Sequence, residues 1–114
     1  MYVKSIRIRR KENDDWYFVQ ESQNGVWVNV RIKCNIFETA CRSITLQVKG
    51  KRRARRLARK YKNSLSLPAG ELVKTSLGFI VYKVRNKMFL SFKRALAYDK
   101  KDEADHRFDT EYIT

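Results

Sequence analysis

Apolar and charged residues alternate near the start of the chain. Over residues 2–9, Ile6 and Ile8 fall on one side of an extended segment, and Arg7 and Arg9 fall on the other. Successive side chains of a β-strand point to opposite faces. The pattern therefore predicts a strand with one apolar face and one cationic face.

Asn24 followed by Gly25 separates two further segments of strand character, residues 16–21 and 26–33. A two-residue type I′ turn requires a positive φ at both central positions, which Asn and Gly adopt most readily. This hairpin and the preceding strand, joined to it by a polar turn at residues 11–15, predict an antiparallel three-stranded meander at the N-terminus.

The turn also sets the register, and the register assigns the faces of the sheet. The expected pairs on the core face are Glu21 with Val28, Val19 with Val30, and Tyr17 with Ile32. The opposite face then carries aromatic, polar and cationic side chains together: Trp16, Phe18, Trp27, Asn29, Arg31 and Lys33. Such a face suits base stacking and phosphate contact. Alternatively, it packs under a helix or the C-terminal tail, with its long cationic side chains reaching water.

The middle of the chain, residues 34–50, fits two patterns, because apolar residues recur first at helical spacing and then in alternation. We expect a short helix that runs into a strand ending at Gly50. After a loop, the expected elements are strands over residues 71–76, 79–85 and 88–94, with the loop at residues 68–70 and a turn at Asn86 and Lys87. Because residues 79–82 are continuously apolar, this hairpin is expected to be buried on both faces.

Between these parts, residues 51–62 predict an amphipathic helix with a wholly cationic outer face. One arc of about 100° carries its apolar residues, Ala54, Leu57, Ala58 and Tyr61. The rest of the surface carries Lys51, Arg52, Arg53, Arg55, Arg56, Arg59, Lys60 and Lys62. Asn63 is the expected left-handed C-terminal cap. Like charges at i,i+4 destabilise such a helix, and a polyanion would relieve the repulsion.

Length and composition are typical of one globular domain. The chain has 114 residues, of which 43% are hydrophobic, and a formal net charge of +14. Residues 99–114 differ from the rest, with six of the twelve acidic residues and only three basic ones. We predict a basic α+β domain over residues 1–98, built from one antiparallel sheet of about five or six strands with one or two packed helices. An acidic tail, residues 99–114, follows it.

The sequence offers no template for metal, cofactor or catalytic chemistry. Cys34, Cys41 and the single histidine, His106, are too few for a zinc site, and the cysteines are expected to be small, reduced core residues. The acidic group at residues 102–106 is expected to be solvated. No P-loop, dinucleotide turn or Ser/His/Asp set is visible. We therefore expect a protein without metal or cofactor that is not an enzyme. Lacking an apolar span or signal peptide, it is expected in the cytoplasm, with no membrane partner.

The cationic helix points to nucleic-acid binding, with DNA and RNA both open, mainly through the phosphate backbone. Arg52, Arg55, Arg56 and Arg59 lie nearest the centre of the cationic arc, and guanidinium groups bind phosphate bidentately. The other candidates extend the footprint: Lys51, Arg53, Lys60 and Lys62 in the helix; Arg7, Arg9, Arg31, Lys33 and Lys49 in strands; and the aromatic residues Trp16, Phe18 and Trp27.

Other classes stay open. A small basic protein, virus-encoded for instance, could act as an inhibitor or adaptor by binding an acidic surface of a nucleoprotein machine. The chain also resembles small toxin ribonucleases of the RelE type in size, basicity and α+β make-up, which implies mRNA positioned by Arg, Lys and Tyr. Residues 1–33, with two basic strands, an aromatic middle strand and a Gly turn, look like the three-stranded DNA-binding modules of some integrases and transposases. That second resemblance implies a mobile-element protein that reads the major groove.

Overall fold

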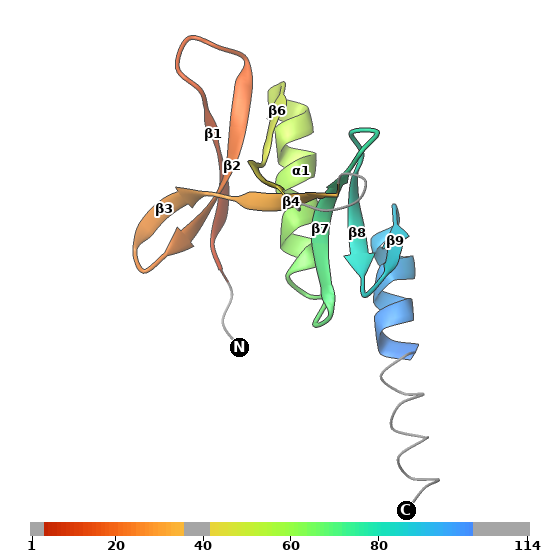
Figure 1. The fold of residues 1–114 in the computed structure, drawn as a ribbon. Coiled ribbons are helices and arrows are strands. Elements are labelled where there is room, and N and C mark those ends of the chain that lie inside the picture. The colour runs from red at the N-terminus through yellow and green to blue at the C-terminus, as the bar shows by residue number, and fades with distance from the viewer. Residues whose placement is uncertain (1–3, 36–41, 102–114) are drawn as a thin grey trace, which may run out of the picture.

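The computed structural model describes residues 4–35 and 42–101, and it confirms an α+β domain (Figure 1). The described part contains nine strands in two sheets, whereas the sequence predicted one sheet of five or six strands. The helix predicted after residue 34 falls largely in residues 36–41, as does Cys41, and these lie outside the described residues.

The two sheets are mostly antiparallel. The first contains β1 (Ile6–Arg10), β2 (Trp16–Gln23), β3 (Val26–Asn29) and β6 (Gln47–Lys49), with β3 and β6 paired to opposite ends of β2. The second has the order β5 (Arg42–Thr45), β4 (Arg31–Asn35), β7 (Gly70–Thr75), β8 (Ile80–Val84) and β9 (Lys87–Phe89). Its β4–β7 pair is parallel.

The predicted N-terminal meander is confirmed as β1, β2 and β3. Asn24 and Gly25 have φ values of 52° and 80°, as a type I′ turn requires. Gln23 pairs with Val26, and Glu21 pairs with Val28. The turn residues therefore set the register that the sequence predicted.

The long strand predicted over residues 26–33 is divided at Val30, where the chain leaves the first sheet and enters the second. The chain makes the reverse change at Leu46, between β5 and β6. Backbone hydrogen bonds join Val30 N–H to the Val19 carbonyl (2.9 Å), Leu46 N–H to the Val30 carbonyl (2.8 Å) and Val19 N–H to the Leu46 carbonyl (3.0 Å). All three side chains are at most 1% exposed, so this junction of the two sheets is the centre of the core.

The division at Val30 makes one expected pairing wrong. Val19 and Val30 are hydrogen-bonded as expected, but Ile32 pairs with Ile44 in the second sheet and not with Tyr17. A sequence pattern of alternation continues through such a corner, because a strand that changes sheets keeps its extended backbone.

The basic helix is α1 (Lys51–Ser64), which contacts β1, β2 and β6 of the first sheet and β7 of the second (Figure 1). Ala54 is fully buried, and Leu57, Ala58 and Tyr61 pack against the core. The expected left-handed cap at Asn63 is wrong. The helix continues through Ser64, and its C-cap, Leu65, has a right-handed helical backbone conformation. The Leu65 N–H donates hydrogen bonds to the carbonyls of the last turn.

The C-terminal half of the domain contains the predicted hairpin as β7 and β8. Val81 and Tyr82, on opposite faces of β8, are 5% and 3% exposed, so burial on both faces is confirmed for these two residues. It is wrong for Phe79, which lies in the turn before β8 and is 58% exposed. The next turn lies at Arg85 and Asn86, one residue earlier than predicted, with Arg85 at a φ of 55°.

The strand predicted over residues 88–94 is wrong, because β9 ends at Phe89 and residues 92–101 are helical. Phe92, Ala95 and Leu96 recur at helical spacing and pack against the core. Asp99, in the segment that composition assigned to the tail, is 4% exposed, so the domain extends at least to residue 101.

Candidate nucleic-acid interface

The side of α1 that faces away from the core is lined with cations. Arg52, Arg55, Arg56 and Arg59, which we call the arginine face, are all exposed. Lys51, Arg53 and Lys62 on its flanks are exposed as well. The exposure of these cations follows from the amphipathic pattern. The apolar side of α1 packs on the first sheet, so the cationic side faces solvent.

The charge of the arginine face is not neutralised by its own chain. The first turn of α1 contains no acidic residue, and its N-cap, Gly50 at a φ of 93°, supplies no side-chain cap. Lys51, Arg52 and Arg53 therefore add to the positive end of the helix dipole. Pairs of like charge at i,i+4, such as Arg55 and Arg59, each destabilise the helix by about 0.2–0.5 kcal/mol. Across residues 4–35 and 42–101, no cation of α1 forms an ion pair.

Lys60 differs from the other cations of the helix. Its side chain is partly buried, and Nζ donates a hydrogen bond to the Ile80 carbonyl (2.5 Å) and lies 5.4 Å from the centre of the Tyr82 ring. Burial lowers the pKa of the Lys60 ammonium from its ordinary value. Lys60 therefore ties α1 to β8, and it is less available to an external phosphate than the exposed arginines.

A groove runs along the seam where the two sheets meet α1. Its main hollow, of about 560 Å³, is lined by residues of both sheets, α1 and the turns: Trp16, Gln47, Val48, Arg53, Arg56, Leu57, Lys60, Lys74, Gly78, Phe79, Ile80 and Leu90. We call it the seam groove. Of these residues, Trp16, Arg53, Arg56 and Lys60 were predicted from the sequence, whereas Lys74 and Phe79 were not. Lys74 lies in β7 and Phe79 directly precedes β8, in a hairpin that the sequence assigned to the core.

The predicted aromatic and cationic face of the first sheet is assembled only in part. Trp27 is 37% exposed, and the Arg7 guanidinium lies 4.2 Å from the centre of its ring. Arg7 Nε also donates a hydrogen bond to Gln20 Oε1 (2.8 Å). Phe18 is partly buried, and Arg9 is exposed. The helix α1 packs on the other face of this sheet, against Ile6, Ile8 and Glu21, so it does not cover Trp27; of the predicted aromatic residues, Trp16 lines a hollow together with α1. The other alternative, packing under the C-terminal tail, mostly concerns residues 102–114, which lie outside the described residues.

Other predicted members of that face lie elsewhere. Arg31 and Lys33 belong to β4 in the second sheet, and Trp16 lies at the opposite end of β2 from the residue that pairs with Trp27. Lys49 is exposed and pairs with Trp16 just before α1 begins. The division of the strand at Val30 is the cause, because it carries the residues after it into another sheet.

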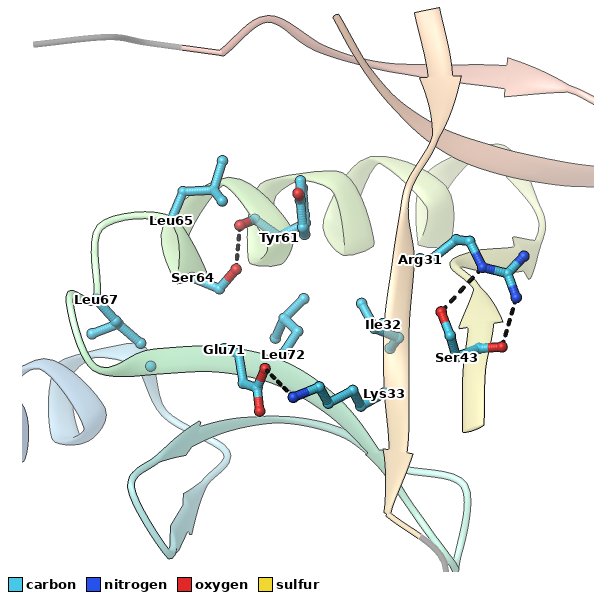
Figure 2. A pocket seen from close by; sticks show the side chains of 11 residues that line it. Arg31, Ile32, Lys33, Ser43, Tyr61, Ser64, Leu65, Leu67, Glu71 and Leu72 are labelled. Atoms are coloured by element: carbon cyan, nitrogen blue, oxygen red, sulfur yellow. Dashed lines mark hydrogen bonds and ion pairs between the residues drawn. The ribbon is translucent and has the colours of Figure 1, made fainter. Parts of the chain in front are cut away.

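Arg31 and Lys33 line a separate pocket of about 490 Å³ between β4, β7 and the end of α1 (Figure 2). Arg31 donates hydrogen bonds to the Ser43 side chain and carbonyl (3.0 and 2.7 Å), and Lys33 Nζ lies 3.9 Å from the Glu71 carboxylate. The positive groups of this pocket thus have partners within the chain. They are weaker candidates for phosphate binding than the arginine face.

The position of α1 on the first sheet is fixed by a buried carboxylate. Glu21 is 6% exposed and accepts hydrogen bonds from the Tyr61 hydroxyl (2.7 Å) and Gln23 Nε2 (2.8 Å), and Lys4 Nζ lies 3.6 Å away. Burial, together with the Glu21 carboxylate, raises the pKa of the Tyr61 phenol well above its ordinary value. The sequence placed Glu21 on the core face, but it gave no sign of its partner on the helix.

The described residues contain neither a candidate metal-ligand group nor a helix that could span a membrane. No group of three or more His, Cys, Asp or Glu residues there could hold a metal ion, and Cys34 is a half-buried free thiol. No helix among the described residues has the length and apolar character needed to span a bilayer.

Comparisons with known proteins found no similar chain. Neither a protein-family model, a curated protein nor a solved structure matches this chain.

Proposed function

We propose that this protein binds nucleic acid through the phosphate backbone, with the arginine face of α1 as its main contact. The observation that carries the proposal is that four exposed arginines share one side of a helix and have no ion-pair partner among the described residues. Repulsion between these arginines destabilises the helix, and a bound row of phosphates would remove that repulsion.

The spacing of the arginines suits an anionic group that repeats along the ligand, as the phosphates of a nucleic acid do. A guanidinium donates two parallel hydrogen bonds to one phosphate, and residues at i,i+3 and i,i+4 of a helix lie about 5–6 Å apart. Arg52, Arg56 and Arg59 follow this spacing along a helix that packs against the core. Contact through the backbone carries no sequence information, so we expect affinity without strong sequence preference.

The test is the dependence of affinity on salt. If about five phosphates are neutralised, log K falls with log[salt] at a slope of roughly −3.5 for single strands and −4.5 for duplex. Fluorescence anisotropy with labelled DNA and RNA, each single- and double-stranded, measures it. A slope near zero, or equal affinity for polyglutamate, contradicts the proposal and favours an acidic protein partner.

A matched pair of variants separates contact from overall charge. One replaces Arg52, Arg55, Arg56 and Arg59 with Ala, and the control replaces the exposed cations Lys11, Arg42, Lys93 and Arg94 with Ala. Both lose four positive charges. Only the first should reduce the salt slope by about 3, because only it removes phosphate contacts.

A further inference from the structure

The seam groove continues beyond its main hollow. A second hollow of about 440 Å³ adjoins it, lined by Trp16, Ile44, Thr45, Leu46, Gln47, Lys74 and Ile80. The two hollows share Trp16, Gln47, Lys74 and Ile80, so they lie next to each other along the seam. Two neighbouring hollows suit a chain-like ligand better than a compact one.

The lining combines cations with exposed aromatic rings and contains no acidic residue. Trp16 is 37% exposed and Phe79 is 58% exposed, although each is large and apolar. Trp27 is equally exposed, but the Arg7 guanidinium already lies over its ring. The Trp16 ring has no aromatic or cationic partner among the described residues.

The turn that presents Phe79 is held in place before any ligand binds. The Phe79 carbonyl accepts from Thr75 N–H (2.8 Å), and Phe79 N–H donates to Thr75 Oγ1 (3.1 Å). Gly78, at a φ of 91°, completes the turn with a hydrogen bond from its N–H to the Thr75 carbonyl (2.9 Å). The backbone at Phe79 is therefore already ordered, so a ligand that stacks on the ring has only the side-chain torsions left to order.

A ligand that satisfies both parts of the lining carries negative charge along its length and offers flat, apolar faces. Unpaired nucleotides do so, because their bases are free to stack on aromatic rings while their phosphates meet the cations. In a duplex the base faces are covered by the neighbouring bases. An acidic peptide carries carboxylates but has no flat aromatic group at each residue that could stack on Trp16 or Phe79. Arg56 belongs both to the groove and to the arginine face, so one strand could pass from the helix into the groove.

We propose that the seam groove binds single-stranded nucleic acid, with bases stacked on Trp16 and Phe79 and the backbone held by Arg53, Arg56 and Lys74. This proposal rests on the proposed function and adds a preference for unpaired strands. Gln47, which is exposed and lines both hollows, is placed to hydrogen-bond a base edge.

The two tryptophans of the chain allow a direct test. The Trp27→Phe variant leaves Trp16 as its only tryptophan, and Trp16→Phe leaves Trp27. The probes are an oligothymidylate of about 12 nucleotides, an abasic strand with the same number of phosphates, and the matching duplex. We expect the oligothymidylate to quench the fluorescence of the Trp27→Phe variant and not that of the Trp16→Phe variant, and the abasic strand to quench neither.

Affinity provides the second readout. Oligothymidylate should bind at least about fivefold more tightly than the abasic strand, because each of the two stacked bases provides about fivefold to a hundredfold. Trp16→Leu should lower that ratio by at least about fivefold, whereas the control Trp27→Leu should not, with melting temperatures confirming that both variants fold. Lys74→Gln should weaken the binding of both strands.

The outcomes separate this inference from the proposed function. Salt-dependent binding with equal affinity for the oligothymidylate and the abasic strand, or tighter binding of duplex, overturns the groove assignment and leaves binding by the arginine face intact. Salt-independent binding or no binding to any probe overturns both.

Discussion

The bond between Tyr61 and Glu21 offers a sharp test of how the basic helix is attached to the first sheet. The Tyr61 hydroxyl donates to Glu21 Oε2 at 2.7 Å across 40 positions of the chain, joining the last turns of α1 to β2. The perturbation is Tyr61→Phe, which removes the hydroxyl and keeps the ring. The ring packs against the core, so the variant isolates the hydrogen bond.

The expected magnitude follows from the surroundings of the carboxylate. A hydrogen bond to a charged group contributes about 1.5–3 kcal/mol to stability. Glu21 keeps Gln23 and Lys4 as partners after the change, so we expect the lower part of that range, about 1.5–2 kcal/mol. For a domain of this size that corresponds to a fall in melting temperature of roughly 6–16 °C.

Urea unfolding followed by circular dichroism measures the free energy of unfolding, with Tyr17→Phe as the matched control. Tyr17 lies in the same strand as Glu21 and is partly buried, but its hydroxyl has no hydrogen-bond partner in the described part of the chain. We expect the control to change stability by less than about 0.5 kcal/mol. A double-mutant cycle with Glu21→Gln should give a coupling energy of about 1 kcal/mol or more between Tyr61 and Glu21.

The pH dependence provides an independent check. The pKa of Tyr61 is raised in the folded protein, so its stabilising effect is complete below the ordinary phenol pKa of 10.0 and is lost as the pH rises above it. The difference in stability between the wild type and Tyr61→Phe should therefore shrink above about pH 10. Equal stability of the two proteins at pH 7, or an equal loss in Tyr17→Phe, refutes the argument.

Three further predictions follow from other parts of the domain. Arg52→Glu should raise the free energy of unfolding by about 0.3–1 kcal/mol, since it places an anion at the positive end of α1, and should weaken nucleic-acid binding; a lower melting temperature contradicts the electrostatic argument. Gly70→Ala should destabilise the fold by about 1–3 kcal/mol, because the new Cβ would lie 2.6 Å from Leu67 Cβ; an unchanged urea midpoint shows that Leu67 yields freely. Asp99→Ala should lower the melting temperature, because the buried carboxylate accepts a hydrogen bond from Ala69 N–H; no change would show that residue 99 belongs with the tail.

Local patterns were sufficient where one element decides the outcome. The Asn24–Gly25 turn was predicted with its register, because its backbone conformation depends on two residue types. The cationic helix and its exposed arginines were predicted because their periodicity needs only one apolar surface to pack on. The helix at residues 92–101 was missed, although Ser91 before an apolar i,i+3,i+4 pattern is a typical helix start.

The α+β class, the meander, the hairpin and the charge of α1 follow from local patterns, because alternation, helical periodicity and turn residues act within a few positions of the chain. The positions at which strands change sheets, Val30 and Leu46, depend instead on how the whole domain packs, since an extended backbone looks the same in either sheet. That choice moved Arg31 away from Trp27. It also brought Trp16 into one groove with Phe79, because a meeting of distant segments depends on how the whole core packs.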